Sequence, residues 1–404
     1  MATISRDAET AVLTAAALPP LSPDESDHSA QVAAHLRALI AGAGGWLPFS
    51  QFMYAALYAP GLGYYMAGGR RFGASGDFVT APELSPLFAR CLAGPVAELL
   101  DRVDGSEIVE LGAGSGKLAA DLLQALARRN ALPRRYRIVE VSAALRAEQR
   151  ARLAAIPSIA ERIEWLDAPP TVGWQGVVIA NEVIDALPVE RFCIAGAGCD
   201  AFGVIADERD FAWQSRPAEA ALAALVKATM ARLPAPLPSG YVSELRPILP
   251  AWLATVTGSL VRGAMLAIDY GLPRAQYYHA LRDGGTLCGF YRHRRVDDVL
   301  ARPGLQDLTA WVDFSALADA ALACGLDLGG FASQAHFLAA AGIDRELAAL
   351  VANASERERF ALMQSAQILM LPGEMGERFK VMALTRGIAE QLTGFGFRDL
   401  SQSL

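Results

Sequence analysis

The sequence predicts an α/β fold in which a mostly parallel sheet carries helices on both faces, extended by a helical N-terminal segment and a helical insertion. Through the central part of the chain, short apolar stretches alternate with stretches of helical spacing, a pattern typical of parallel βαβ units with right-handed crossovers. A glycine-rich loop joins the first apolar stretch to the helix after it. With 53% hydrophobic residues among 404, the chain can bury a sizeable core.

The elements are predicted in chain order from this periodicity. Before the sheet, apolar residues recur at helical spacing in three segments, which are 31–41, a helix starting at Pro48, and 86–100. The predicted strands of the sheet are Ile108–Leu111, Tyr136–Val141, Ile163–Leu166, Gly176–Ala180, Gly263–Tyr270 and Phe379–Leu384. The helices predicted between the first three strands are Lys117–Arg128 and Ala143–Leu153. Ala-rich helices and prolines interrupt this rhythm at about 205–260, which indicates an insertion.

These elements divide the chain into six predicted segments. They are a mobile leader (1–28), an N-terminal helical or lid segment (29–104), a cofactor-binding core (105–204), a helical insertion on the substrate side (205–262), the rest of the core with inserted helices (263–390) and a C-terminal tail (391–404).

Composition excludes several classes of protein. The 43 acidic and 36 basic residues give a net charge of -7, which argues against bulk attraction to nucleic-acid phosphates. The five cysteines form no CxxC pair, and no HExxH motif is present, so we expect neither a disulfide framework nor a metal site. No apolar run approaches the ~18 residues that span a bilayer, and no secretory signal is apparent. We therefore expect a cytoplasmic protein without membrane insertion.

The glycine-rich loop follows the first predicted strand, and its spacing separates three ligand classes. A phosphate-binding P-loop would need Ser or Thr where Leu118 stands, and a dinucleotide fingerprint would need its third glycine where Lys117 stands. The run Glu110–Gly116 instead has the form GxGxG with an acidic residue before it, which suits S-adenosylmethionine better. A purely structural turn is the alternative.

Two acidic residues follow the next strands of the predicted sheet. Glu140 ends the second strand, where a carboxylate can accept hydrogen bonds from both ribose hydroxyls of an adenosine; the alternative is an edge glutamate paired with an arginine. Asp167 follows the third strand and is a candidate acceptor for the adenine amino group, or else a turn residue before two prolines.

Several motifs in combination resemble the MidA-like family of class I methyltransferases over residues 31–387. The motifs are Glu110–Gly116, Tyr136–Ser142, Asn181–Pro188, Gly76–Glu83, Ile268–Gly271, Thr309–Phe314 and Gly376–Lys380. The resemblance implies a Rossmann-like core of seven strands and dependence on S-adenosylmethionine. Mitochondrial members are linked to symmetric dimethylation of an arginine on a respiratory complex I subunit, while bacterial members largely lack assigned substrates.

The chemistry of the acceptor is predicted from the end of the fourth strand. Asn181 and Glu182 stand at the edge where open α/β sheets bind ligands. Carboxylates suit a guanidinium, and on a short helical turn Glu182 and Asp185 would share a face and could hold an arginine. The alternatives are that Glu182 binds the methionine amine of the cofactor and that Asp185 caps a helix.

We therefore expect a methyltransferase that acts on an arginine of a protein partner, with a respiratory-complex subunit among the candidates and a monomer or homodimer as its state. The alternatives are a small-molecule O- or N-methyltransferase and a non-catalytic assembly factor. The predicted catalytic residues are Glu182 and Asp185. The predicted cofactor-binding residues are Asp77 and Thr80, as parts of a lid loop, and Glu110, Gly112, Ala113, Gly114, Gly116, Glu140, Val141, Asp167 and Asn181.

Overall fold

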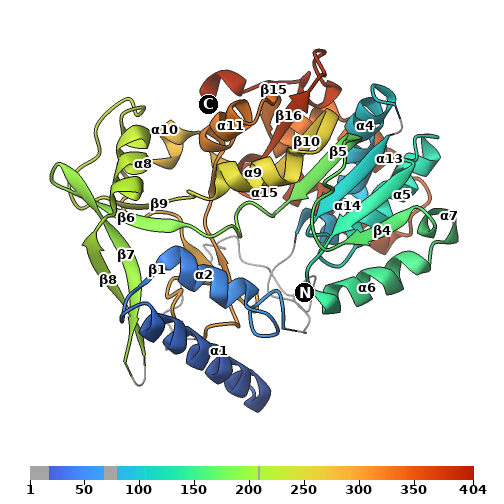
Figure 1. The fold of residues 1–404 in the computed structure, drawn as a ribbon. Helices are drawn as coiled ribbons and strands as arrows, with labels where there is room; N and C mark the ends of the chain where they lie inside the picture. The colour runs from blue at the N-terminus through green and yellow to red at the C-terminus, as the bar shows by residue number, and fades with distance from the viewer. Residues whose placement is uncertain (1–17, 68–79, 105, 208–209) are drawn as a thin grey trace. The chain divides into compact units, whose positions relative to one another are not determined.

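The computed structural model describes residues 18–67, 80–104, 106–207 and 210–404, which form two compact units (Figure 1). The described part of the first unit comprises 18–67, 186–207, 210–247 and 278–310, and that of the second comprises 80–104, 106–185, 248–277 and 311–404. Among the described residues, no helix is long and apolar enough to cross a membrane.

The second unit is built on an eight-stranded sheet. Its strands are β2 (Glu107–Leu111), β3 (Arg135–Val139), β4 (Ile163–Leu166), β5 (Trp174–Asn181), β10 (Leu260–Leu272), β14 (Val312–Asp313), β15 (Asp327–Ser333) and β16 (Phe379–Arg386). The strand order is β15-β16-β10-β5-β2-β3-β4, with β14 added beside β10. Strands β2, β3, β4, β5 and β10 run parallel, and β16 runs antiparallel to both of its neighbours. This mostly parallel sheet confirms the predicted α/β class.

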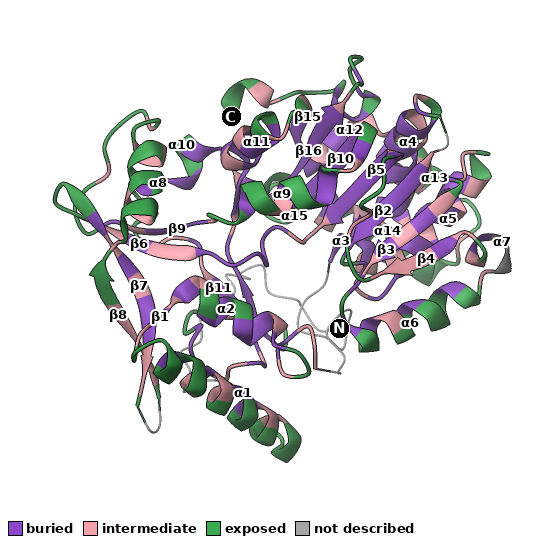
Figure 2. Ribbon diagram, in the orientation of Figure 1, coloured by how far each residue is buried: buried purple, intermediate pink, exposed green. Residues whose placement is uncertain are grey.

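Helices cover both faces of this sheet, and Figure 2 shows its strands as the most buried part of the unit. The helices are α3 (Ala81–Leu84), α4 (Leu87–Asp101), α5 (Lys117–Arg128), α6 (Ala143–Ala154), α7 (Pro157–Ala160), α9 (Leu249–Thr257), α10 (Arg274–Tyr277), α11 (Phe314–Ala323), α12 (Gln334–Ala340), α13 (Ile343–Val351), α14 (Glu356–Met370) and α15 (Met375–Arg378). One face packs against α4, α5 and α12 in a core cluster that includes Ile108 and Leu266. Toward the other face, Phe314 of α11 lies 5.2 Å from Phe331 of β15, measured between ring centroids.

The first unit combines helices with two antiparallel sheets. Its elements are α1 (Pro23–Gly42), β1 (Leu47–Pro48), α2 (Phe49–Tyr58), β6 (Glu190–Ala195), β7 (Gly198–Ala206), β8 (Phe211–Pro217), α8 (Ala220–Met230), β9 (Val242–Leu245), β11 (Cys288–Tyr291), β12 (Arg294–Val296) and β13 (Asp307–Thr309). The larger sheet has the order β1-β7-β6-β9 with β8 paired to β7, and the smaller has the order β12-β11-β13. Helix α1 begins with a capping box formed by Ser22 and Glu25, so ordered helix already occupies the end of the predicted leader.

The predicted helical insertion differs from the structure. Helices α8 and α9 do form within 205–262, but the same segment also contains β8, β9 and the end of β7. Strands β7 and β8 pair from Asp200 opposite Pro217 to Ala206 opposite Phe211. Aromatic side chains suit such a pleated surface, and Phe202 packs edge to face with Trp213 at 6.0 Å between ring centroids. The high alanine content of the neighbouring sequence favoured the helical prediction over these strands.

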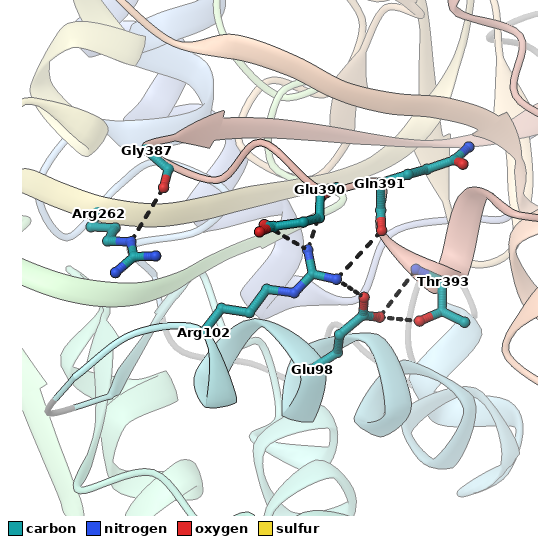
Figure 3. A network of polar contacts seen from close by, with 7 residues as sticks. All are labelled: Glu98, Arg102, Arg262, Gly387, Glu390, Gln391 and Thr393. Carbon is teal, nitrogen blue, oxygen red and sulfur yellow. Dashed lines mark hydrogen bonds and ion pairs between the residues drawn. The ribbon is translucent and has the colours of Figure 1, made fainter.

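The predicted C-terminal tail also differs, because residues 391–404 pack onto the second unit. The segment forms two short 3-10 turns, Thr393–Phe395 and Ser401–Ser403, and Phe395 is buried in the core. Figure 3 shows how α4 holds its start: Glu98 accepts the backbone N–H of Thr393 at 3.0 Å, and Arg102 donates to the carbonyl of Glu390 at 3.1 Å. The end of the described chain is thus part of the fold.

Candidate active site

The glycine loop lies between β2 and α5, as predicted. Gly112, Gly114 and Gly116 have φ values of 58°, 53° and 78°, a left-handed region that side chains with a Cβ rarely adopt. Helix α5 begins directly after Gly116, so its first N–H groups and the positive end of its dipole face the loop. This geometry allows a ligand to approach the backbone closely.

Two further predicted residues lie at or near this loop. Ala113 is buried within it. Thr80 is buried just before α3, and Glu83 of α3 accepts a hydrogen bond from the Ser115 hydroxyl, which ties α3 to the loop. Asp77, the other predicted lid residue, lies outside the described residues.

Glu140 follows β3 and is nearly buried, with 5% of its surface exposed. Its Oε1 accepts the backbone N–H of Ser142 at 2.9 Å, and its Oε2 accepts the side-chain N–H of Gln149 at 3.1 Å. Burial raises the pKa of Glu140, and these hydrogen bonds oppose that rise. The backbone N–H of Val141 also bonds to this carboxylate, and a carboxylate has about four acceptor positions, so Glu140 can still accept a ligand hydroxyl.

Glu110, which the sequence predicts to bind the cofactor, is bonded to another residue of the sheet in this structure. It is 3% exposed, and its Oε2 accepts the Tyr136 hydroxyl at 2.8 Å. Burial, assisted by the nearby charge of Glu140, raises the pKa of Glu110 to about 7, although the Tyr136 hydrogen bond works against this. Glu110 is therefore an internal group beneath the loop in this structure, and its role toward a cofactor stays a prediction.

Asp167 and Val141 stand at the surface of the same sheet edge. The Asp167 side chain is 93% exposed, and its Oδ1 pairs with Arg146 at 2.5 Å. Arg146 also donates to the backbone carbonyls of Glu140 and Leu166, at 2.5 and 2.9 Å. This arginine links the ends of β3 and β4, and sequence reasoning missed it. Val141 is an exposed apolar side chain, at 55%.

The turn after β5 carries Asn181 and Glu182. Glu182 has a φ of 54°, so the helical turn expected there does not form, and the backbone N–H of Glu182 instead bonds to the carbonyl of Ile268 on β10 at 2.8 Å. The Asn181 amide donates to the Glu182 carboxylate at 3.2 Å. The Asn181 Oδ1 is buried and has no hydrogen-bond partner within the described part of the chain, so it is an acceptor able to serve a ligand donor.

Asp269 fixes this turn from the end of β10. It is fully buried, and its Oδ2 accepts the backbone N–H groups of Ile184 and Asp185 at 3.0 and 3.1 Å. Its Oδ1 accepts the N–H of Tyr270 at 2.9 Å, and the Tyr270 hydroxyl donates to the Asp185 carboxylate. The left-handed conformation of Glu182 costs roughly 1 kcal/mol, and such strain persists where surrounding contacts over-determine it. The predicted catalytic residues thus sit on a rigid turn.

The structure brings most of the predicted residues to one edge of the sheet in the second unit. The sequence signal for Asp269 was its position at the end of a predicted strand beside Tyr270, whereas nothing in the sequence marked Gln149 or Arg146. Among the described residues, no cluster of acidic, histidine or cysteine side chains could hold a metal ion.

These residues fit S-adenosylmethionine. The glycine loop leaves backbone accessible, and Glu140 is an acceptor after β3. The Asn181 Oδ1, which has no hydrogen-bond partner among the described residues, and the Glu182 carboxylate are acceptors suited to the cationic amine of a methionine moiety. The chain's own groups therefore match both ends of such a molecule.

Comparisons with known proteins agree with this fit. A family model of S-adenosyl-L-methionine-dependent methyltransferases matches residues 91–332. The mitochondrial protein arginine methyltransferase NDUFAF7 of Rattus norvegicus is 30% identical over 399 residues, covering 90% of this chain and 86% of the relative. Its homologue from Caenorhabditis elegans is 29% identical, covering 84% of this chain and 83% of the relative.

A solved structure extends the agreement to the whole fold. A COG1565 superfamily protein from Burkholderia thailandensis, solved with bound S-adenosyl-homocysteine, is 45% identical with a TM-score of 0.90, covering 96% of this chain and 100% of that one. The chain therefore belongs to the MidA-like family of S-adenosylmethionine-dependent methyltransferases.

Proposed function

We propose that this enzyme methylates an arginine side chain of a protein partner. The name of the Rattus norvegicus relative supports this substrate class. The observation that carries the proposal is the presence of two carboxylates, Glu182 and Asp185, on one rigid turn at the end of β5. A guanidinium presents planar N–H donors that pair well with carboxylate oxygens.

The chain's residues have separate tasks in this proposal. Bound S-adenosylmethionine supplies a methyl group on a positively charged sulfur. Glu182 and Asp185 hold the guanidinium and orient one terminal nitrogen, and a nearby carboxylate accepts the proton that this nitrogen loses. The Tyr270 hydroxyl restrains Asp185 through its hydrogen bond.

For the cofactor, we propose that Glu140 accepts the ribose hydroxyls and that Asn181 Oδ1 accepts from the methionine amine. The glycines of the loop would pass close to the methionine moiety without a steric conflict. We also propose that Asp77, Thr80, Val141 and Asp167 contact the cofactor.

The partner and the compartment are further proposals. A respiratory complex I subunit is the partner class that the family resemblance implies. For the compartment we propose the cytoplasm, which composition favours; the two relatives are named as mitochondrial proteins.

Glu182→Gln tests the substrate assignment. The amide keeps the size of the side chain but removes the charge and turns one acceptor into a donor. We expect methyl transfer to fall at least tenfold while S-adenosylhomocysteine affinity, measured by calorimetry, stays within a few-fold. Loss of one charge-assisted hydrogen bond, about 1.5–3 kcal/mol, corresponds to this range.

The assay uses S-adenosylmethionine with a labelled methyl group and a protein extract from cells that lack this gene, followed by amino-acid analysis of the labelled product. Glu161→Gln, at an exposed position after α7, is the matched control. If Glu182→Gln weakens cofactor binding tenfold or more, Glu182 binds the methionine amine instead. Label recovered only in small molecules would reject the protein-arginine proposal.

A further inference from the structure

Gln149 is a completely buried polar residue of α6 that contacts the glycine loop. Its amide nitrogen donates to the backbone carbonyl of Gly114 at 2.9 Å and to Oε2 of Glu140 at 3.1 Å. Its amide oxygen accepts the indole N–H of Trp165 on β4 at 3.0 Å. One side chain therefore bridges the glycine loop, the residue after β3 and strand β4.

The orientation of this amide is determined by its partners. An indole N–H can only donate, so the oxygen of Gln149 must face Trp165. A backbone carbonyl can only accept, so the NH₂ group must face Gly114 and, beside it, Glu140. Glu140 consequently receives a fixed donor on Oε2 in addition to the Ser142 N–H on Oε1, and these two bonds set the plane of its carboxylate.

The backbone of Gln149 also packs directly against the loop. A Cβ placed on Gly116 would lie 3.3 Å from the Gln149 Cα and 3.2 Å from its Cγ, closer than ordinary van der Waals contact. The glycine at 116 therefore permits the close approach of α6 that brings the Gln149 amide within reach of Gly114 and Glu140. Gln149 thus makes both the steric contact with Gly116 and the hydrogen bonds to Gly114 and Glu140.

We propose that Gln149 is a positioning residue for cofactor recognition, which holds the Glu140 carboxylate in the orientation that the ribose hydroxyls require. This inference rests on the proposed ribose contact of Glu140. Trp165 supports it one step further away by orienting the Gln149 amide.

The test is a double-mutant cycle on S-adenosylhomocysteine affinity, measured by calorimetry. Gln149→Met keeps a similar volume but removes all three hydrogen bonds, and we expect the Kd to rise at least tenfold. Glu140→Gln should raise it by a similar factor. The double variant should bind no more than about threefold weaker than Glu140→Gln alone, because residues that act as one unit are not additive.

Two other variants complete the design. Gln124→Met, on α5, is the matched control, because within the part of the chain that the structure describes the Gln124 amide donates only to the carbonyl of Ala120, one turn earlier in its own helix. The Kd of this variant should stay within twofold of the wild type. Trp165→Phe removes the donor that orients Gln149, so the Kd should rise two- to fivefold. This variant leaves Gln149 in place and decides the matter if Gln149→Met does not fold, as judged by circular dichroism.

Each result bears on one assignment. An unchanged Kd for Glu140→Gln would overturn the ribose contact itself. Weakened binding by Glu140→Gln together with wild-type binding by Gln149→Met, or by Trp165→Phe if the former does not fold, would overturn only the positioning role. Fully multiplicative effects in the double variant would also overturn it, because Gln149 would then act on the loop independently of Glu140.

Discussion

Asp269→Asn is the substitution that most directly tests how the active-site turn is held. The two oxygens of Asp269 face three backbone N–H groups, at 3.0, 3.1 and 2.9 Å. An asparagine has one acceptor oxygen, so its NH₂ group must face at least one of these donors. Losing one charge-assisted hydrogen bond costs about 1.5–3 kcal/mol. The asparagine NH₂ would also face a backbone N–H in a buried site, and this contact between two donors adds to the cost.

We therefore expect Asp269→Asn to lower the free energy of unfolding by about 2–4 kcal/mol, measured by urea denaturation with circular dichroism. Methyl transfer should fall more than S-adenosylhomocysteine affinity, because the turn carries Glu182 and Asp185. Asp121→Asn is the control, since its partly exposed ion pair with Lys117 should contribute less than about 1 kcal/mol. A change below about 0.5 kcal/mol for Asp269→Asn would refute the reasoning.

Two further substitutions test residues in the glycine loop and in the strand before it. Gly116→Ala should weaken S-adenosylhomocysteine binding at least fivefold in calorimetry, because φ is 78° there and the new Cβ would press on Gln149; wild-type affinity would mean that α6 can move away freely. Glu110→Gln should flatten the dependence of stability on pH. The pKa of Glu110 is raised from 4.5 to about 7 by burial, so the folded state retains a proton that the unfolded state releases, and the contribution of Glu110 to stability should fall by roughly 3 kcal/mol from pH 4.5 to 7. Urea midpoints across this range would contradict the assignment if wild type and variant ran parallel.

The central sheet could be predicted because its signals are local. The helix predicted at Lys117–Arg128 has those bounds in the structure, and the predicted strand Gly176–Ala180 lies within β5. The positive φ values of the glycine loop follow from its composition in the same way.

The support of the site could not be predicted, because it depends on contacts between distant parts of the chain. Gln149 bonds to a residue 35 positions away, and Asp269 to one 84 positions away. Buried polar residues of this kind look like ordinary surface or strand residues until the packing is known. Similarly, the hydrogen bond from Tyr136 to Glu110 joins two neighbouring strands, so it could not be predicted from the glycine-loop motif alone.

The position of β16 in the sheet has a consequence for biosynthesis. This strand lies between β10 and β15, yet the ribosome makes it after both of them. Until it arrives, β10 lacks a neighbour on one side and β15 has no strand to pair with in the described sheet, so both present unpaired backbone groups to other nascent chains, which favours aggregation. A chaperone that recognises extended apolar segments would find its target in this interval, and premature termination upstream of Phe379 would leave both strand edges permanently open.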